Sequence, residues 1–317
     1  MNIVVLDGYC LNPGDLDWEG FRTLGNLTVY DRTPAAQIVE RQGDAEAMLT
    51  NKCIISREVL DALPGLKYIG ELATGYNNID YVYASAKGIT VTNIPAYSTE
   101  SVVQHVFALL FEIVNKTSMH AASVRQGDWV RSRDFCYYEK ISELSGKTIG
   151  IIGYGRIGRR VAEIAEAFGL NVVAYNKGKS GAAGVKGKLV SSLEELYRVS
   201  DIVSLNCPLN AENAGMINKA AIDKMKPGVI LINTARGGLI NESDLAEALW
   251  EGRVAAAGLD VLGKEPPLSD NPLLAAPRTV ITPHIAWATT EARRRLMKIA
   301  EENLRAYLAG APINKIN

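Results

Sequence analysis

The chain contains three histidines, so there are few side chains that could donate or accept a proton near neutral pH. His284 ends the apolar run TVITP, which we interpret as a buried strand. Open α/β folds bind ligands at the carboxyl ends of their strands, where an imidazole can reach one. His105 lies in an apolar helical stretch and is interpreted as core packing, and His120 lies in a polar stretch without an obvious partner. His284 is therefore the candidate acid–base residue.

Two other charged residues follow apolar runs of the same kind. Glu265, in VLGKEPP, could bond the second ring nitrogen of the histidine, raise the pKa of the imidazole and hold the ring. Arg236, in INTARGG, offers a fixed cation with forked donors that suit a carboxylate or a polarised carbonyl. The structural alternatives are a surface ion pair for Arg236, a solvated Glu265 and a strand-capping His284. One reaction that needs all three residues explains them better than coincidence.

A glycine motif lies between the apolar run TIGII and the helical stripe of RRVAEIAEAFG. Gly153, Gly155 and Gly158 form G-x-G-x-x-G, which permits a tight turn, close approach of backbone to a pyrophosphate, and close packing of helix on strand. Arg156 and Ile157 would present backbone N–H groups at the helix start. The alternative is a glycine-rich turn without a ligand, but the strand and helix around the motif favour a dinucleotide site.

The position that would contact the adenosine ribose is unusual. The run NVVAYN ends in Asn176, where NAD-binding fingerprints usually have Asp or Glu, about 20 residues after the last glycine. Asn176 can bond a ribose hydroxyl but does not repel a 2′-phosphate. Lys177 and Lys179 follow it in the loop KGKSGAAGVKGK, although both lysines could simply be solvated. The residues therefore leave the cofactor open between NAD and NADP.

A nicotinamide cofactor and a histidine together suit one reaction. Hydride transfer to a ketone leaves an alkoxide, and His284 is the predicted donor of the proton that it must receive. Glu265 would orient the ring, and Arg236 would anchor the substrate. The sequence therefore predicts an oxidoreductase acting on a small 2-keto acid and the corresponding 2-hydroxy acid.

Short apolar runs alternate with helical stretches along the chain, which predicts β-α units, parallel sheets and an α/β fold. A long buried helix is expected from about residue 100, followed by a polar stretch at about 115–145 and a second β-α series that starts at KTIGIIGYG. The expected strands of the first series are 3–6, 27–30, 53–56, 68–72 and 89–93. Those that follow TIGII in the second series are NVVAYN, DIVSLNCP, GVILINTA, VAAAGLDV and TVITPHI, and a last helix covers TTEARRRLMKIAEENLRAYLAG.

Composition excludes several classes of protein. With 34 basic and 35 acidic residues, a formal charge of −1, the chain has no field to attract nucleic acid. Its four scattered cysteines predict reduced thiols and neither a disulfide nor a metal site. The N-terminus lacks the basic start of a leader and no apolar run approaches about 18 residues, so no membrane association is expected. We expect a cytoplasmic protein.

Several motifs together carry a family resemblance. GYGRIG, NTARGG, GLDV followed by EPP, and TPHIAWAT occur in an order and spacing that resemble the D-isomer-specific 2-hydroxyacid dehydrogenase family over nearly the whole chain. ELATGYNNID and NIPAYSTESVVQHVFALL resemble its substrate loop and interdomain helix. The resemblance implies a Rossmann NAD(P)-binding domain, residues 100–285, inserted into a flavodoxin-like substrate-binding domain, residues 1–99 plus 286–317.

The resemblance also implies contacts with substrate and cofactor. Arg236 and backbone N–H groups of the substrate loop would hold the substrate carboxylate. The substrate-binding residues implied are Leu72 in the pocket wall, Ala73, Thr74, Gly75, Arg236 and Trp287. On the cofactor, Thr234 and Ala235 would contact the nicotinamide half, Asp260 the carboxamide, and Cys207 with Pro208 the adenosine, so that Cys207 is expected to pack and not to act as a nucleophile.

Trp287 in PHIAWAT and the run NIPAYSTESVVQH look like the glycerate dehydrogenases, or hydroxypyruvate reductases, of this family. The implied pair is hydroxypyruvate and D-glycerate, with glyoxylate and glycolate second; D-lactate and D-3-phosphoglycerate dehydrogenases are alternatives. The family favours NAD slightly over NADP, although Asn176 leaves the choice open. Residues 115–145 resemble its dimerisation segment and predict a homodimer, unless they pack within one chain.

Two further alternatives differ in function from a 2-hydroxyacid dehydrogenase. A dinucleotide-sensing regulator could keep this fold with little turnover, but it would not need Arg236, Glu265 and His284 together. A formate dehydrogenase shares the architecture, but Glu265 argues against it because a different residue would pair with the histidine.

Overall fold

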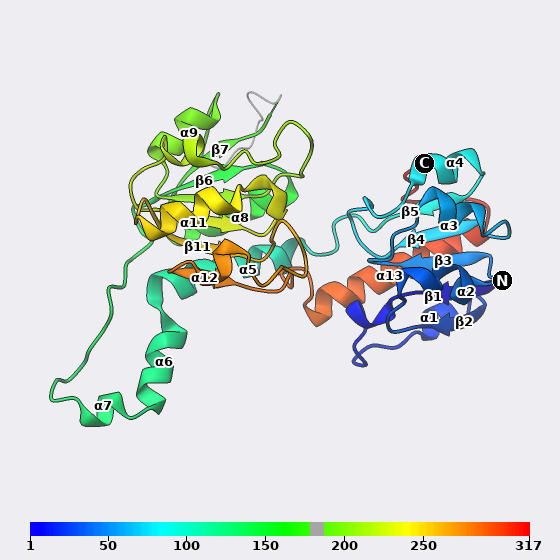
Figure 1. Ribbon diagram of the computed structural model, residues 1–317, viewed down its shortest axis with the longest axis horizontal. Helices are drawn as coiled ribbons and strands as arrows, with labels where there is room; N and C mark the ends of the chain where they lie inside the picture. Colours follow the sequence, from blue (N-terminus) through cyan, green and yellow to red (C-terminus); the bar gives the residue numbers. More distant parts are fainter. Residues whose placement is uncertain (178–186) are drawn as a thin grey trace. The chain divides into compact units, whose positions relative to one another are not determined.

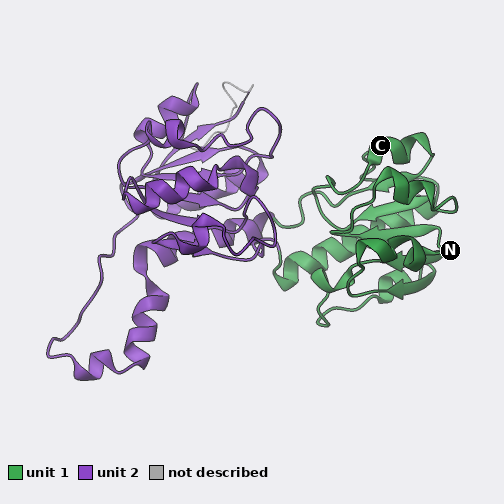
Figure 2. Ribbon diagram, viewed as in Figure 1, with its two compact units in different colours: residues 1–98, 288–317 green, residues 99–287 purple. Residues whose placement is uncertain are grey.

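The computed structural model describes residues 1–177 and 187–317. The chain divides into two compact units, Met1–Ser98 with Ala288–Asn317 (unit 1) and Thr99–Trp287 (unit 2), shown in green and purple in Figure 2. Unit 2 is thus inserted into unit 1. Each unit has its own parallel sheet, which confirms the predicted α/β class. Lys179 and most of the predicted basic loop lie outside the described residues.

Unit 1 contains a five-stranded parallel sheet with helices around it (Figure 1). Its elements are β1 (Asn2–Val5), η1 (Gly8–Cys10), α1 (Glu19–Arg22), β2 (Asn26–Val29), η2 (Ala35–Gln37), α2 (Ile38–Gln42), β3 (Ala47–Thr50), α3 (Arg57–Asp61), β4 (Tyr68–Glu71), α4 (Tyr81–Ala86), β5 (Thr90–Thr92) and α13 (Thr290–Leu308). The strand order, β2-β1-β3-β4-β5, is that of flavodoxin-like sheets. The carboxyl ends of β1, β3 and β4 therefore lie side by side.

One predicted strand of unit 1 is wrong. The sequence predicts a strand at 53–56, whereas the third strand is β3, whose four residues are all buried. Within 53–56, Ile55 forms only an isolated bridge, and Ser56 caps α3. The cause is the Asp7 carboxylate after β1, which accepts the backbone N–H groups of residues 51–53 and turns the chain there. A pattern of apolar residues cannot reveal such a turn.

Unit 2 contains a seven-stranded parallel sheet. Its elements are α5 (Thr99–Asn115), α6 (Thr117–Arg125), α7 (Asp128–Arg131), β6 (Thr148–Ile152), α8 (Arg156–Ala167), β7 (Asn171–Tyr175), β8 (Lys188–Leu189), α9 (Leu193–Val199), β9 (Ile202–Leu205), α10 (Lys219–Ile222), β10 (Val229–Asn233), η3 (Gly237–Leu239), α11 (Glu242–Trp250), β11 (Val254–Leu259), α12 (Pro272–Ala275) and β12 (Thr279–Ile281). The order β12-β11-β10-β9-β6-β7-β8 is that of a Rossmann sheet, and it reverses between β6 and β9.

Two layers of helices bury the sheet of unit 2. Helices α5 and α8 pack on one face, and α9, α10 and α11 cover the other. The predicted long helix is α5, and its apolar stripe, including Val102, Val106, Leu109 and Leu110, is buried as expected. This packing fixes the strand ends that carry the candidate site.

Residues 115–145 leave the body of unit 2 as an arm that carries α6 and α7 (Figure 1). Neither helix contains a buried residue. Within the described part of the chain, no helix has both the length and the apolar character that a membrane crossing needs.

Candidate active site

The central contact of the site joins His284 and Glu265. Nδ1 of His284 lies 2.5 Å from Oε2 of Glu265, and both side chains are partly exposed. Oε1 of Glu265 accepts the backbone N–H of Leu262, which fixes the carboxylate after β11. An Nδ1–H that donates to the carboxylate leaves Nε2 of the imidazole for a ligand. The structure thus brings together two of the three residues proposed for the chemistry.

The backbone at His284 is held in an uncommon conformation. Its φ of 55° lies in the left-handed region, and its N–H donates to the carbonyl oxygens of Asp260 and Thr282. The Asp260 carboxylate, 1% exposed, accepts the N–H groups of Ile285 and Ala286 at 2.9 Å each. Asp260 therefore secures both sides of the histidine turn, a role that is separate from its predicted contact with the nicotinamide carboxamide.

His105 supports this turn, so the interpretation of it as core packing was incomplete. Its Nε2 lies 2.9 Å from Oγ1 of Thr282 and 3.4 Å from Oδ1 of Asp260. Because the Thr282 hydroxyl donates to Asp260 at 2.6 Å, it accepts from His105, which assigns the ring proton to Nε2. Ser101, one turn earlier in α5, donates to the carbonyl of Ala286. The sequence did contain a signal for this contact, because Ser101 and His105 are polar residues at positions i and i+4, on the same face of an otherwise apolar helix.

Arg236 lies in the loop after β10, next to β11 in the sheet. Its side chain is exposed, and Nη1 donates to the carbonyl of Ala235. The buried Asn233 shapes the loop by accepting the N–H of Ala235 and donating to the carbonyl of Arg236. A Cβ on Gly237 would lie 1.9 Å from the carbonyl carbon of Leu262, so only glycine lets this loop pack against the one that carries Glu265. Sequence reasoning missed Asn233, although an Asn at a strand end is a known turn former.

The glycine turn has the geometry that a dinucleotide requires. Gly153 has a φ of 95°, and a Cβ there would lie 2.7 Å from the backbone of Asn206 and Cys207. A Cβ on Gly158 would lie 2.1 Å from the carbonyl oxygen of Gly153, whereas a Cβ on Gly155 would meet open space. Helix α8 begins directly after Gly155, with unbonded N–H groups expected in its first turn. The residues present therefore fit a pyrophosphate group.

The other predicted cofactor residues lie at the same edge of the sheet of unit 2. Asn176 follows β7, and the neighbouring Lys177 pairs with Glu212 on the surface. Cys207 and Pro208 follow β9 and adjoin the glycine turn. Burial raises the pKa of the Cys207 thiol, which keeps it uncharged and a weak nucleophile. Thr234 and Ala235 lie in the Arg236 loop, and Trp287 is the last residue of unit 2.

In unit 1, the predicted substrate loop follows β4. Leu72 is fully buried, whereas Thr74 is exposed. Thr74 is anchored by its hydroxyl, which donates to the carbonyl of Ile94, and by its own carbonyl, which accepts from Asn93. The backbone N–H groups of Ala73, Thr74 and Gly75 donate to no other residue that the structure describes. Three neighbouring free donors can bind an anion.

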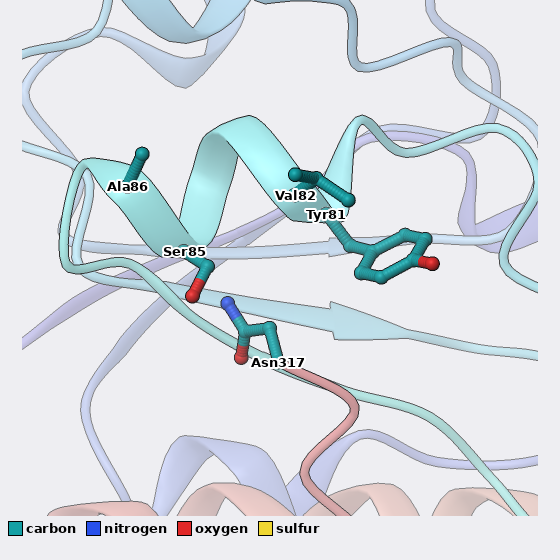
Figure 3. A pocket seen from close by; sticks show the side chains of 5 residues that line it. All are labelled: Tyr81, Val82, Ser85, Ala86 and Asn317. Atoms are coloured by element: carbon teal, nitrogen blue, oxygen red, sulfur yellow. The ribbon is translucent and has the colours of Figure 1, made fainter.

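A shallow hollow of about 300 Å³ lies elsewhere on unit 1, between α4 and the chain end (Figure 3). It is lined by Tyr81, Val82, Ser85, Ala86 and Asn317, none of which is a candidate site residue. The residues 1–177 and 187–317 contain no group of three or more His, Cys, Asp or Glu side chains arranged to hold a metal ion.

Comparisons with known proteins agree with this geometry. The family model described as D-isomer specific 2-hydroxyacid dehydrogenase, NAD binding domain, matches residues 107–286. The chain is 49% identical to hydroxypyruvate reductase of Blautia hydrogenotrophica, with 100% of both chains covered, and 40% identical to glycerate dehydrogenase of Methylorubrum extorquens, with 88% of both covered. A solved acyclic imino acid reductase in complex with NADPH and D-Arg has a TM-score of 0.87 and 34% identity, with 100% of both chains covered.

The chain therefore belongs to the D-isomer-specific 2-hydroxyacid dehydrogenase family, as its motifs suggested. It is an oxidoreductase that transfers a hydride between a nicotinamide cofactor and a 2-hydroxy acid/2-keto acid pair. The family description refers to NAD and the imino acid reductase holds NADPH, so either dinucleotide fits the family.

Proposed function

We propose that this enzyme reduces hydroxypyruvate to D-glycerate, with glyoxylate as a second substrate. The observation that carries the proposal is the 2.5 Å contact between His284 and Glu265 at the end of the Rossmann sheet, beside the Arg236 loop. The names of the two relatives support the choice of substrate. D-lactate and D-3-phosphoglycerate dehydrogenation are the alternatives within the family.

The residues of unit 2 divide the proposed reaction among them. When bound, the reduced nicotinamide supplies the hydride for the keto carbon. His284 gives the proton on Nε2 to the oxygen that becomes the hydroxyl group, and Glu265 stabilises the imidazolium and holds its orientation. Arg236 binds the keto oxygen and the carboxylate of the substrate through its forked donors.

We assign substrate recognition in unit 1 to the loop Leu72–Gly75. The three free N–H groups of Ala73, Thr74 and Gly75 would bind the substrate carboxylate, and the anchoring of Thr74 keeps them in place. Trp287 would limit the size of the substrate, whereas Leu72, which was expected in the pocket wall, is fully buried and would support the loop from within the core. Unit 1 is then the substrate-binding domain, and unit 2 the cofactor-binding domain.

For the cofactor, we propose that the start of α8 binds the pyrophosphate and that Asn176 bonds the adenosine ribose. Thr234, Ala235 and Asp260 would contact the nicotinamide half. Asn176 lacks the negative charge that excludes a 2′-phosphate, so we propose that both NAD and NADP are accepted, with NAD slightly preferred.

The first test is a matrix of substrates and cofactors. Purified enzyme is mixed with hydroxypyruvate, glyoxylate, pyruvate or 3-phosphohydroxypyruvate, each with NADH and with NADPH, while the absorbance of the reduced nicotinamide is followed. The fastest loss is expected with hydroxypyruvate. Faster loss with pyruvate or the phosphorylated acid would reassign the substrate, and tight cofactor binding without turnover would favour a dinucleotide sensor.

We also propose that the arm of residues 115–145 binds a second copy of the chain. Val130, Phe135 and Tyr138 are 89%, 92% and 71% exposed. Large apolar side chains that are exposed close together mark sites of protein–protein contact. The indole of Trp129 donates to the carbonyl of Phe135, which orders this apolar surface. A homodimer would cover it.

A further inference from the structure

A buried carboxyl group lies directly before the predicted substrate loop. Glu71 is the last residue of β4 and is 0% exposed. Its side chain points to the same face of the strand as Ile69, which belongs to the core of unit 1. A carboxyl group in such a place is unfavourable unless it is uncharged or well bonded. The proposed chemistry does not use Glu71, so its presence needs another explanation.

The hydrogen bonds near Glu71 are distributed unevenly. The Asp7 carboxylate, after the neighbouring β1, accepts the hydroxyl of Thr50 and three backbone N–H groups, those of residues 51–53. Glu71 accepts one bond, from Nδ2 of Asn78 to its Oε2 at 3.0 Å. Its Oε1 has no partner among the described residues. Asp7 thus has four donors and Glu71 has one, so an ionised Glu71 would be far less stabilised by hydrogen bonds than Asp7 is.

Burial raises the pKa of Glu71 to about 9 against the hydrogen bond from Asn78, which lowers it; the negative charge of Asp7 adds to the rise, and Lys52 opposes it. The Cys53 thiol of the same cluster has its own pKa raised to about 12, mainly by burial, and the pKa of the Cys10 thiol is raised as well, by desolvation and by the charge of Asp7. Glu71 is therefore protonated at neutral pH and ionises before the Cys53 thiol does. Ionisation would place a second negative charge near Asp7 in a buried cluster.

Glu71 and Asn78 enclose the predicted substrate loop from its two ends. Asn78 donates through Nδ2 to Glu71 and also to the carbonyl of Cys53. Between them, the carbonyl of Leu72 accepts from Asn51, whose Nδ2 lies 2.7 Å away. The segment 72–77 is thus held at one end by the buried Glu71 and Asn51 and at the other by the partly buried Asn78.

We propose that Glu71 and Asn78 are positioning residues that hold the loop Leu72–Gly75 in the conformation that binds the substrate carboxylate. The inference rests on the proposed function, because it takes this loop as the carboxylate site. It predicts that substrate affinity falls when Glu71 ionises, since the charged group is no longer stable in the cluster and the loop must shift. The affinity of unit 2 for the cofactor should not change when Glu71 ionises.

The test compares Glu71→Leu, Glu71→Gln and Asn78→Ala with the wild type. The variants Glu71→Leu and Asn78→Ala should raise the KM for hydroxypyruvate by about tenfold or more, with kcat and the Kd for NADH within about twofold. Glu71→Gln, which keeps a neutral acceptor, should restore KM towards the wild-type value. The matched control is Tyr68→Phe, which removes a buried bond to Thr92 from the other face of the same strand and should leave KM within about twofold.

A second experiment measures how the affinity for oxamate, an unreactive analogue of a 2-keto acid, depends on pH in the NADH-bound enzyme. From pH 8 to pH 10 the neutral fraction of Glu71 falls about tenfold, so the Kd of wild-type enzyme for oxamate should rise about tenfold more than that of Glu71→Gln. Any pH effect that arises outside the Glu71 cluster is common to both proteins and cancels in this comparison. A merely structural Glu71 would not produce the difference.

Unchanged KM in Glu71→Leu and Asn78→Ala, or the same alkaline rise in wild type and Glu71→Gln, would overturn the inference while leaving the proposed function intact. If Glu71→Leu does not fold, Asn78→Ala and the pH comparison still decide the question. A wild-type protein that neither reduces a 2-keto acid nor binds oxamate at pH 7 would overturn the proposed function, and this inference with it.

Discussion

Glu71→Gln should stabilise the protein at neutral pH, and the gain should grow as pH rises. In the folded chain the pKa of Glu71 is raised from 4.5 to about 9, mainly by burial, so the folded state keeps a proton that the unfolded state has lost. Where the folded state binds more protons, the free energy of unfolding falls with rising pH. The contribution of the wild-type residue is thus fully present below about pH 4.5 and is lost progressively up to about pH 9. Gln does not titrate, so its contribution to the free energy of unfolding does not change with pH.

The magnitude follows from the width of this window. Each pH unit between the two pKa values changes the free energy of unfolding by about 1.4 kcal/mol. Between pH 6 and pH 8 the advantage of Glu71→Gln over wild type should therefore increase by about 3 kcal/mol. This is a large part of the roughly 5–15 kcal/mol that stabilises a typical domain.

Urea unfolding at pH 6, 7 and 8, followed by circular dichroism, measures the difference between the two proteins. Tyr68→Phe serves as the control, because it alters a buried hydrogen bond of β4 without a group that ionises in this range, and its difference from wild type should stay constant. If the difference between Glu71→Gln and wild type is also constant, Glu71 is ionised in the folded protein and the reasoning fails.

The remaining predictions concern unit 2. His284→Ala should lower kcat by about 10² to 10⁴ because the proton donor is lost, with the Kd for NADH within about twofold by fluorescence titration; normal turnover would exclude His284 as the donor. Arg236→Lys should lower kcat/KM by about tenfold to a hundredfold in steady-state assays, since a point charge lacks the forked donors, and near wild-type kinetics would contradict the assignment. Val130→Glu in the arm should convert a dimer to a monomer by light scattering, whereas the control Val82→Glu, 65% exposed on α4, should not; equal masses would refute the arm as the interface.

The sequence predicted the fold where apolar runs are continuous and buried. The strands of unit 2, such as NVVAYN and GVILINTA, form as expected because both faces of their sheet are covered by helices. The prediction failed at 53–56, where a buried carboxylate from another strand collects backbone donors and ends β3. That contact joins residues more than 40 positions apart, which no local pattern can register.

The candidate site was predictable to a similar extent. Strand-end position and chemical type were enough to single out His284 and Glu265, and the structure places them in contact. The same reasoning predicted that His105 is a core packing residue. A helical pattern shows which face of a helix is apolar, but not which residues pack against that face. Only the fold reveals that His105 meets Thr282 and Asp260.

Carboxylates at strand ends do different work in this protein, and their hydrogen bonds distinguish them. Asp7 and Asp260 are both buried, and each accepts backbone N–H groups from a neighbouring loop. The oxygen atoms of these two carboxylates therefore stabilise the conformation of the backbone. Glu265 is partly exposed and binds an imidazole that can exchange a proton with a ligand. Glu71 has neither the donors of the first pair nor the exposure of the second, and protonation is the state that remains for it. The partners of a polar residue, more than its place in a motif, are therefore the basis on which we propose that Glu265 takes part in the reaction and that Glu71 positions a loop.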